Sequence, residues 1–469
     1  MPATTPNTTT GADLTRPTTY RFALDPTVAQ AAQFSRYAGA ARWTFNQQIA
    51  RAKANLAQRE AEQSYGLTDD QLTPAVSWSK FSLINYINAY KLGTDPGSPV
   101  TVTDDGTVVR GLPWAHEVSA DVFECASVDA AEALGNYSAS RKGARVGEPV
   151  GFPNFKRRGK VIQSFRLRNR ASGNTTGTVR VAGPKSLRLP RLGEVRVHGS
   201  AKKLRRAVAA GRFRILSVTI SFHRGRWWAA VTGMAAVFHP ARRSTAGRTV
   251  RPVGVDRGVS TLVAAADADR TVVGLWEGVK TYRKHQDALA KASRWLARTT
   301  PGSKRNARAR ARVNRLHAKI ANIRRHVAHQ VSSELTATVT VLAVENLNVK
   351  GMMSRPAPRP DPEAPGGFAP NGAAAKAGLN KSLADAAMAE VGRQLAYKAD
   401  WYGVQVLTAD RWVPSSKMCS KCGNMKPVLG LDQRRYVCAV CGLNEDRDVN
   451  AAANLAGWAE KALAGAIPA

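Results

Sequence analysis

Four cysteines near the C-terminal end carry the clearest chemical signal in the sequence. They form two Cys-x-x-Cys pairs, made by Cys419, Cys422, Cys438 and Cys441. Pairs at this spacing can place four thiolates tetrahedrally around one zinc ion, with each pair on a tight turn. Because four thiolates leave no coordination position open for a substrate, we expect this Zn²⁺ to be structural.

Three acidic residues are candidates for a second, catalytic metal site. Asp256 ends the run Val-Gly-Val-Asp, Glu345 ends Val-Leu-Ala-Val-Glu, and Asp448 lies at the start of an Ala-rich helical pattern. Converging carboxylates are hard oxygen ligands that bind Mg²⁺ or Mn²⁺ and leave positions open for water and phosphate. Two such ions can activate a water molecule and stabilise the leaving oxygen of a phosphodiester, so these acids predict a two-metal nuclease.

Each acid also has a purely structural interpretation. An Asp before a turn that contains Gly is commonly a turn residue, and an Asp at a helix start is commonly the N-cap. Asp446 competes with Asp448 for the role at the start of the last helix. We favour Asp448 because Asn450 follows two residues later and the Ala-rich stretch predicts the first turn of a packed helix.

The elements around these acids occur in the order of a ribonuclease-H-like α/β domain: three strands, a helical hairpin, a strand, a helix, a strand and a last helix. In that fold the first strand, the fourth strand and a late helix bring their acids together. The expected strands are 252–256, 260–265, 271–276, 338–344 and 404–409; the helices are a hairpin over 282–335 broken at 300–303, a helix over 379–402 and one starting near 448. The stretch 350–378, dense in Pro and Gly, is expected to be a loop.

The N-terminal half predicts a β domain with helices inserted into it. A short strand at 20–24 is followed by helical patterns over 27–137, and β-rich runs then fill 165–232. Five short strands with Gly-containing turns predict a small barrel or sandwich. If the first strand pairs with the later ones, the helices are an insertion into this domain.

The charge of the chain favours a polyanionic partner. Lys and Arg number 69 against 34 Asp and Glu, for a net charge of +35. This excess indicates nucleic acid, with a basic membrane-surface protein as the alternative. No apolar run has the length of a transmembrane helix, and the N-terminus lacks a secretory signal pattern.

Several basic clusters are candidates for contact with that partner. They are Lys156, Arg157 and Arg158, a helical stripe of Arg305, Arg308, Arg312, Arg315 and Lys319, and the β-region residues Arg166, Arg168 and Arg170. A solvated surface is the alternative interpretation for each cluster. The overall charge favours contact with phosphates.

The fifth cysteine, Cys125, lies in a helical stretch and is expected to be a buried core residue. With four cysteines assigned to zinc, none remains for a disulfide framework. A reducing cytosol is therefore the expected location.

The sequence resembles the TnpB proteins of bacterial insertion sequences, relatives of the compact type V CRISPR effectors. The resemblance covers most of the chain, and its most specific part is the motif Asp-Arg-Asp-Val-Asn-Ala-Ala-Ala-Asn at 446–454. Also similar are Tyr-Arg-Phe-Ala-Leu-Asp-Pro at 20–26 with Gln30, Gly-Phe-Pro-Asn-Phe-Lys at 151–156, Asn-Lys-Ser-Leu-Ala-Asp at 380–385, and Arg-Trp-Val-Pro-Ser-Ser-Lys-Met-Cys at 411–419.

This resemblance implies a multidomain α+β protein, in which a β-barrel wedge domain with a helical recognition insert precedes a RuvC-like, RNase H-type nuclease domain that carries an inserted zinc ribbon. Asp256, Glu345 and Asp448 would be the metal ligands of the RuvC-like site. The implied ranges are a disordered tail (1–19), the wedge domain (20–26 and 138–236), the recognition insert (27–137), a linker (237–250), the nuclease domain (251–410 and 446–460), a zinc-ribbon target nucleic-acid-binding domain (411–445) and a tail (461–469).

As partners the resemblance implies a guide RNA and the double-stranded target DNA, with base pairing selecting the sequence. It also implies a bacterial cytoplasmic protein associated with the nucleoid. Three departures from the family are the long Pro/Gly loop at 354–378, the polar Thr/Pro tail at the N-terminus, and Arg257, where an aliphatic residue often follows the first acid. Arg257 could place positive charge beside the site.

The leading hypothesis is an RNA-guided, metal-dependent DNA endonuclease of the insertion-sequence type. A compact type V CRISPR effector with the same chemistry is the nearest alternative, and the gene's surroundings would distinguish the two. A guided DNA-binding protein without cleavage is disfavoured because all three acids are present. A plain zinc-ribbon transcription factor would leave the nuclease-like domain unexplained.

Overall fold

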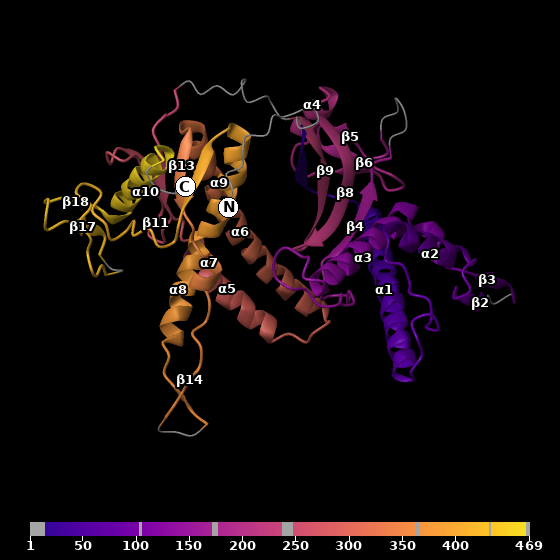
Figure 1. Ribbon diagram of the computed structural model, residues 1–469. Coiled ribbons are helices and arrows are strands. Elements are labelled where there is room, and N and C mark those ends of the chain that lie inside the picture. The colour runs from indigo at the N-terminus through magenta and orange to yellow at the C-terminus, as the bar shows by residue number, and fades with distance from the viewer. Residues whose placement is uncertain are drawn as a thin grey trace. The chain divides into compact units, whose positions relative to one another are not determined.

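The computed structural model describes residues 15–102, 106–170, 177–236, 247–362, 366–430 and 433–465. The chain forms two compact units, unit 1 over Met1–Val237 and unit 2 over Phe238–Ala469 (Figure 1). Residues 1–14 of the predicted tail, 237–246 of the predicted linker and 466–469 of the predicted C-terminal tail lie outside the described residues. Within the described ranges, every helix is too short or too polar to span a lipid bilayer.

Unit 1 is built on two antiparallel sheets, with the orders β1-β9-β8-β4 and β5-β6-β7. Strand β1 pairs with β9 along its whole length, from Thr15 opposite Ala236 to Ala23 opposite Trp228. The helices α1, α2 and α3 therefore lie, in sequence, between the first strand and the rest of its sheet. The elements are β1 Thr15–Ala23, α1 Val28–Ser64, α2 Lys80–Leu92, β2 Val100–Val102, β3 Val108–Arg110, the 3₁₀ helix Pro113–Glu117, α3 Ala120–Arg141, β4 Gln163–Arg168, β5 Arg180–Gly183, β6 Ser186–Leu189, β7 Gly193–Arg196, α4 Lys202–Ala209, β8 Phe213–His223 and β9 Arg226–Ala236.

A capping box starts the long helix α1. The Thr27 side chain accepts a hydrogen bond from the Gln30 backbone at 3.2 Å, and the Gln30 side chain accepts one from the Thr27 backbone at 3.1 Å. These bonds satisfy two backbone donors that the first turn leaves without partners. The Gln30 amide also donates to the Glu194 carbonyl at 2.9 Å, which fixes the helix start to strand β7.

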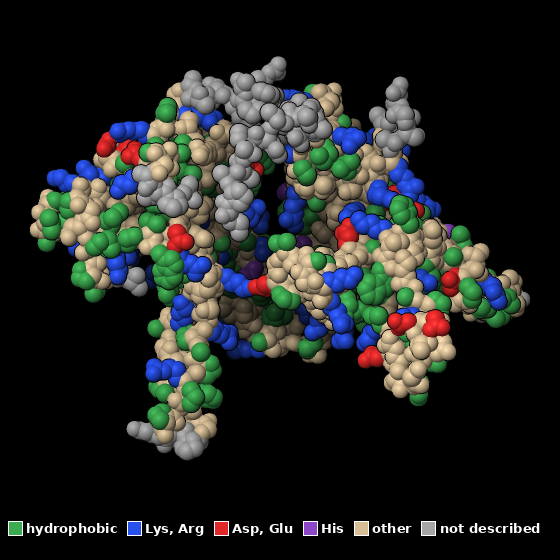
Figure 2. All heavy atoms as spheres, in the orientation of Figure 1, with side chains coloured by type: hydrophobic (Ala, Val, Ile, Leu, Met, Phe, Trp, Pro, Cys, Tyr) green, Lys and Arg blue, Asp and Glu red, His purple; other side chains and the backbone are tan. Residues whose placement is uncertain are grey.

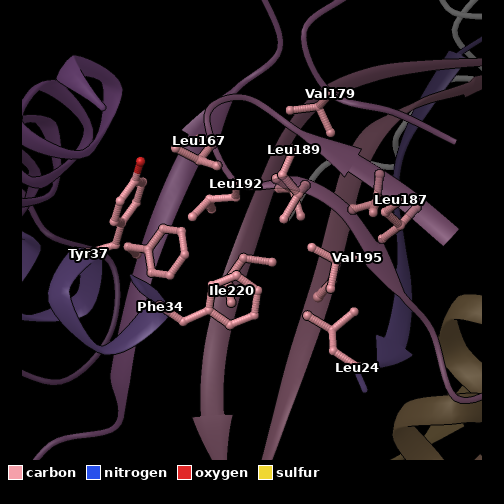
Figure 3. Packing of buried hydrophobic residues seen from close by; sticks show 14 of the residues in the cluster. Leu24, Phe34, Tyr37, Leu167, Val179, Leu187, Leu189, Leu192, Val195 and Ile220 are labelled. Carbon is pink, nitrogen blue, oxygen red and sulfur yellow. The ribbon is translucent and has the colours of Figure 1, made fainter. Parts of the chain in front are cut away.

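The core of unit 1 lies where α1 meets the two sheets. Figure 3 shows Phe34 and Tyr37 of α1 beside Leu167 and Ile220 of the larger sheet, with Val195 of the smaller sheet in the same cluster. All five side chains are at most 2% exposed. Burying each such side chain contributes about 1.5–3 kcal/mol, so this cluster holds the helix and both sheets together.

Two elements of unit 1 differ from the sequence expectation. Strand β1 begins at Thr15, so the residues just before Tyr20 belong to the sheet and not to the predicted disordered tail. Their alternation of exposed and half-buried positions suits an edge strand, where Pro17, which weakens the strand signal in the sequence, is tolerated. Lys202–Ala209 forms helix α4 inside the stretch that was predicted as β, with Leu204 buried.

Three arginines with a predicted nucleic-acid role have protein partners in this structure, and that role stays a prediction. Arg166, Arg168 and Arg170 form ion pairs with acidic side chains of α3. The pairs are Arg166 with Asp129, and Arg168 and Arg170 with Asp121 and Glu124. These arginines connect β4 and the segment after it to α3, because the carboxylates neutralise them.

Unit 2 is organised around one mixed sheet of five strands with the order β12-β11-β10-β13-β16. Strands β12, β11 and β10 run antiparallel, whereas β13 and β16 run parallel to β10. The elements are β10 Val253–Asp256, β11 Thr261–Ala266, β12 Val272–Glu277, α5 Thr281–Ala297, α6 Lys304–Thr338, β13 Val341–Glu345, α7 Val349–Met352, β14 Arg359–Pro360, β15 Phe368–Ala369, α8 Ala373–Ala386, α9 Met388–Tyr402, β16 Gln405–Ala409, β17 Arg435–Val437, β18 Asn444–Asp446 and α10 Arg447–Leu463.

Helices cover both faces of this sheet. On one face Val255 of β10 belongs to a buried cluster with Val331 of α6 and Leu395 of α9. On the other face Leu455 of α10 packs on Ala343 of β13. The strands are therefore apolar on both faces, as expected for strands buried between two helical layers.

The predicted helix over 379–402 is two helices. Ala387 adopts a left-handed conformation with φ +55° and ends α8 before α9 begins. Two residues before the break, the buried Asp385 accepts hydrogen bonds from the backbone N–H of Tyr282 at 2.8 Å and from the Arg324 side chain at 2.7 Å. Asp385 thereby joins α8 to α5 and α6, a tertiary contact that no local pattern encodes.

Candidate active site and zinc site

The first two candidate acids lie at the ends of neighbouring parallel strands. Strands β10 and β13 pair in the register Val255 opposite Val344, and Asp256 and Glu345 are the next residue on each strand. Carboxyl ends of parallel strands meet at one edge of a sheet, so the two carboxylates lie side by side at that edge. Both residues are half-buried.

The third acid, Asp448, lies in the first turn of helix α10, which packs directly on β10. A Cβ atom on Gly254 would lie 1.8 Å from the carbonyl oxygen of Ala452, so a side chain at 254 is excluded by the helix backbone. A Cβ on Gly258, just after Asp256, would lie 3.8 Å from the Asp448 carboxylate oxygen Oδ2. The Gly and Ala residues thus let helix and strand approach closely enough to bring Asp448 to the loop that follows Asp256.

The two acids at the start of α10 have different positions. The Asp446 carboxylate accepts hydrogen bonds from the backbone N–H of Asp448 at 2.8 Å and of Val449 at 3.2 Å, so Asp446 is the N-cap. Capping occupies Asp446 and leaves the side chain of Asp448 in the first helical turn.

Electrostatics show that the three carboxylates interact. Burial raises the pKa of Asp256 well above its usual range, and the negative charges of Glu345 and Asp448 raise this pKa further. Like charges held close together favour the protonated form of one of them. Carboxylate oxygens are hard ligands of the kind that divalent cations such as Mg²⁺ prefer.

Arg257 contacts this site through the backbone. Its Nη2 donates a hydrogen bond to the Glu345 backbone carbonyl at 2.6 Å. Burial lowers the pKa of Arg257, whereas the nearby carboxylates of Glu345 and Asp256 raise it. The positive charge expected beside the site is therefore present, and it fixes the end of β13.

Sequence reasoning assigned no role to Ser415, which contacts the candidate site directly. Its hydroxyl donates to Glu345 Oε1 at 2.6 Å, and the residue is 3% exposed. Helices α8 and α9 and strand β16 separate positions 345 and 415 in the sequence. Only the folded structure therefore shows that the two side chains are bonded. The sole sequence signal is that Ser415 belongs to the family-like stretch at 411–419.

The four cysteines come together as the sequence predicts. Their sulfur atoms all lie within 4.8 Å of one another, with Cys419 and Cys441 at 3.5 Å and Cys422 and Cys438 at 3.6 Å. A tetrahedron with Zn–S bonds of about 2.3 Å places its sulfurs about 3.8 Å apart, so the cluster fits zinc.

Backbone groups of the second knuckle favour the thiolate form that zinc requires. The backbone N–H groups of Cys441 and Val440 lower the pKa of Cys438 to about 6. The turn closes with Gly442 donating to the Cys438 carbonyl at 3.1 Å and adopting φ +71°. Gly423 adopts φ +76° at the matching position of the first knuckle, where the left-handed conformation favours Gly.

Two asparagines of α10 hold the start of the ribbon. The Asn450 amide donates to the Met418 carbonyl at 2.8 Å, and its oxygen accepts from the Ser420 backbone at 2.9 Å. The Asn454 amide donates to the carbonyls of Ser415 and Met418, both at 2.7 Å. Both asparagines are at most 5% exposed, so these bonds are shielded from water.

The candidate nucleic-acid residues fall into two groups. Arg305, Arg308, Arg312, Arg315 and Lys319 are exposed along α6, and Arg157 and Arg158 are exposed after the basic connector. Lys156 instead lies over the Phe45 ring at 3.7 Å, and burial lowers the pKa of its ammonium. Figure 2 shows Lys and Arg side chains outnumbering Asp and Glu on the surfaces in view.

Three family models match the chain, and none describes its whole length. A Cas12f1-like TNB domain matches residues 389–455, a model described as "Probable transposase" matches 240–355, and a helix-turn-helix domain matches 17–61. In this structure the last range holds strand β1 and one continuous helix, α1, instead of two helices joined by a turn.

The protein named "Putative RNA-guided DNA endonuclease Rv2885c" of Mycobacterium tuberculosis is 30% identical over 94% of this chain and 86% of its own length. The chain belongs to the TnpB family. A second TnpB-family relative, InsQ of Escherichia coli, carries the same description and is 28% identical over 93% of this chain and 90% of its own. The structure of a Cas12f1 protein with guide RNA and target DNA aligns at a TM-score of 0.47 and 9% identity, over 95% of this chain and 99% of that one.

Proposed function

We propose that this TnpB-family chain is an RNA-guided DNA endonuclease that cleaves phosphodiesters with Mg²⁺ or Mn²⁺ held by Asp256, Glu345 and Asp448. The observation that carries the proposal is geometric: Asp256 and Glu345 end two paired parallel strands, and Asp448 of α10 lies beside the loop that follows Asp256. Relatives that share most of the chain carry the name of this activity.

The residues of the chain would divide the work as follows. Asp256 and Glu345 offer carboxylate oxygens from the sheet edge, and Asp448 offers one from the first turn of α10. Bound divalent ions supply a polarised water and charge stabilisation at the leaving oxygen. Arg257 and Ser415 hold the backbone and one oxygen of Glu345 in place.

The sheet order of unit 2 supports a nuclease domain of the RNase H type, RuvC-like in detail. Strand β10 is central, β11 and β12 follow antiparallel on one side, and β13 and β16 extend the sheet in parallel on the other. We propose that the zinc ribbon at 411–445 is inserted into this domain. We further propose that the sheets of unit 1 form the wedge domain, with α1, α2 and α3 as its recognition insert.

The partners we propose are a guide RNA and the double-stranded DNA that it pairs with. The net charge of +35 and the exposed basic stripe of α6 support a nucleic-acid partner, because each neutralised phosphate releases counterions. Base pairing would select the target, while the protein holds the backbone of the heteroduplex. A compact type V CRISPR effector would use the same site and is the second candidate.

The deciding experiment purifies the protein, sequences the RNA that copurifies, and tests cleavage of a plasmid that matches this RNA. Cleavage should require Mg²⁺ or Mn²⁺ and should be lost in Asp256→Ala, which should keep its RNA. Asp400→Ala, an exposed carboxylate of α9, is the matched control and should cut normally. Full cleavage by Asp256→Ala would refute the site, and a wild-type protein that binds the target without cutting would indicate a guided binding protein.

A further inference from the structure

We infer that Ser415 is a positioning residue for Glu345, and that Asn450 and Asn454 connect it to the zinc ribbon. This inference rests on the proposed nuclease site. It gives a role to the asparagines of the closing motif, which the metal-ligand assignment leaves without one.

The contacts form one continuous chain of hydrogen bonds. Glu345 Oε1 accepts from the Ser415 hydroxyl at 2.6 Å, and the Ser415 carbonyl accepts from Asn454 at 2.7 Å. Asn454 and Asn450 both donate to the Met418 carbonyl, immediately before the zinc ligand Cys419. Helix α10, which also carries Asp448, is therefore bonded to the segment that orients a second acid.

Burial makes these bonds costly to lose. Ser415 is 3% exposed, Asn454 5% and Asn450 0%, so a broken bond would leave a polar group without water as a substitute. The Ser415 hydroxyl donates to Oε1 of Glu345, and among the residues that the structure describes no donor is bonded to Oε2, which a metal ion could use. Bonds of this kind, which orient a metal ligand, typically change metal affinity or activity by about 10–100-fold when they are removed.

The test compares Ser415→Ala with Ser416→Ala in the RNA-loaded protein. Ser415→Ala should raise the Mn²⁺ dissociation constant, measured by calorimetry, by about 10–100-fold. Zinc content and the amount of bound RNA should not change. Ser416→Ala removes the neighbouring hydroxyl. Among the residues that the structure describes, this hydroxyl makes no bond to Glu345, so the variant should leave the Mn²⁺ affinity unchanged.

A double-mutant cycle separates the connection from general damage. Asn454→Ala should weaken Mn²⁺ binding and speed hydrogen exchange at 415–420 while zinc is retained. The double variant Ser415→Ala/Asn454→Ala should bind Mn²⁺ no more weakly than Ser415→Ala, because Asn454 acts through Ser415. Unchanged Mn²⁺ affinity in Ser415→Ala, or additive losses in the double variant, would overturn the inference. If the wild-type protein failed to cleave a target that matches its RNA, the result would instead count against the proposed function.

A second, independent feature is a basic groove between α5, α6 and α8 in unit 2. Two adjoining cavities of about 700 and 300 Å³ share Tyr282 and Lys381 in their walls. The larger is also lined by His317 and Arg355, and the smaller reaches Val259, three residues after Asp256. The groove therefore ends at the loop that follows the first candidate acid.

The charge of the groove is positive. Its acidic wall residue, Asp385, already accepts from Arg324 and from the backbone of Tyr282. Among the residues that the structure describes, Lys381 and Arg355 have no carboxylate partner. We propose that the groove binds phosphates of the single DNA strand that reaches the candidate carboxylates, since it ends three residues after Asp256 and cavities of this size admit a few nucleotides.

The test reverses the charge with Arg355→Glu/Lys381→Glu and uses Lys461→Glu, on the exposed end of α10, as the control. For single-stranded DNA, the slope of log affinity against log salt concentration should become shallower by about 0.7 for each lost phosphate contact. A shallower slope for single-stranded DNA would support the proposal. An unchanged slope for single-stranded DNA, with or without a loss of copurifying RNA, would overturn it.

Discussion

The two candidate metal sites of unit 2 are built in opposite ways. The four cysteines lie on two tight knuckles of one short stretch, and backbone hydrogen bonds within each knuckle set their geometry. The three carboxylates come from a strand, a second strand paired in parallel with it, and a helix packed across both. The zinc site is therefore a local structure, whereas the carboxylate site depends on the packing of the whole unit.

This difference shows what holds each site in place. Zinc itself supplies the folding energy of a small thiolate site, so the ribbon needs little hydrophobic core. Like-charged carboxylates repel one another, so the sheet and α10 must hold them together before any cation binds. The close contact of Gly254 with Ala452 and the bond from Ser415 to Glu345 are two devices that do so.

Removal of zinc should have the largest effect and should remain local. Cys438→Ser, or chelation, should reduce zinc from about one ion per chain to none, because thiolate sites of this class bind zinc with about 10–16 kcal/mol. Elemental analysis and hydrogen exchange should show an unfolded β17–β18 hairpin beside a protected sheet. Cys125→Ser, at a buried cysteine outside the cluster, should keep its zinc. Simultaneous unfolding of all of unit 2 would show that the ribbon is not local.

A Cβ at Gly254 should disturb the carboxylate site through the fold. Gly254→Ala places a methyl group 1.8 Å from the Ala452 carbonyl oxygen, and such overpacking costs about 1–3 kcal/mol. Thermal unfolding should shift downward and Mg²⁺ affinity should fall, while zinc content stays constant. The control is Gly457→Ala on α10, where no atom lies within 4 Å of the added Cβ. This variant should be neutral or stabilising. Equal stability of the two variants would refute the close contact.

The smallest expected effect is a pH dependence of stability that the metal-free carboxylate site should show. Because the pKa of Asp256 is raised in the folded protein, the metal-free fold binds this proton more tightly than the unfolded chain. Its stability should therefore fall as pH rises from about 4, the unfolded pKa, to the raised folded pKa, by at most about 1.4 kcal/mol per pH unit. Mg²⁺ should reverse this loss, and cleavage should decline as pH falls through the raised pKa. Melting curves of Asp256→Asn without metal should lack the slope.

Much of the local structure could be predicted from sequence. The zinc cluster follows from spacing alone, and the three strands that begin unit 2 follow from short apolar runs with tight turns between them. The burial of Cys125 also follows from its helical surroundings. The assignment of Asp256, Glu345 and Asp448 as metal ligands stays a prediction, although the structure makes their charges interact.

Contacts between distant residues could not be predicted. The left-handed Ala387 interrupts a helical pattern, and Asp385 just before it has its partners on α5 and α6. The basic character of Arg166 and its neighbours suggested phosphate contact but gave no sign of their ion pairs with acids of α3. The bond from Ser415 to Glu345 likewise joins positions that only the fold brings together. Composition and periodicity describe a segment by itself and contain no information about its partner.

The pairing of β1 with β9 has a consequence for synthesis of the chain. The hydroxyls of Thr19 and Thr232 meet at 3.1 Å across the two strands, although 213 residues separate them in sequence. At 5–20 residues per second, β1 therefore waits roughly 10–40 s on the ribosome before its partner exists. A strand that waits unpaired invites aggregation, and charged residues and proline counteract it. Arg16, Pro17 and Arg21 within β1 give the waiting strand this protection.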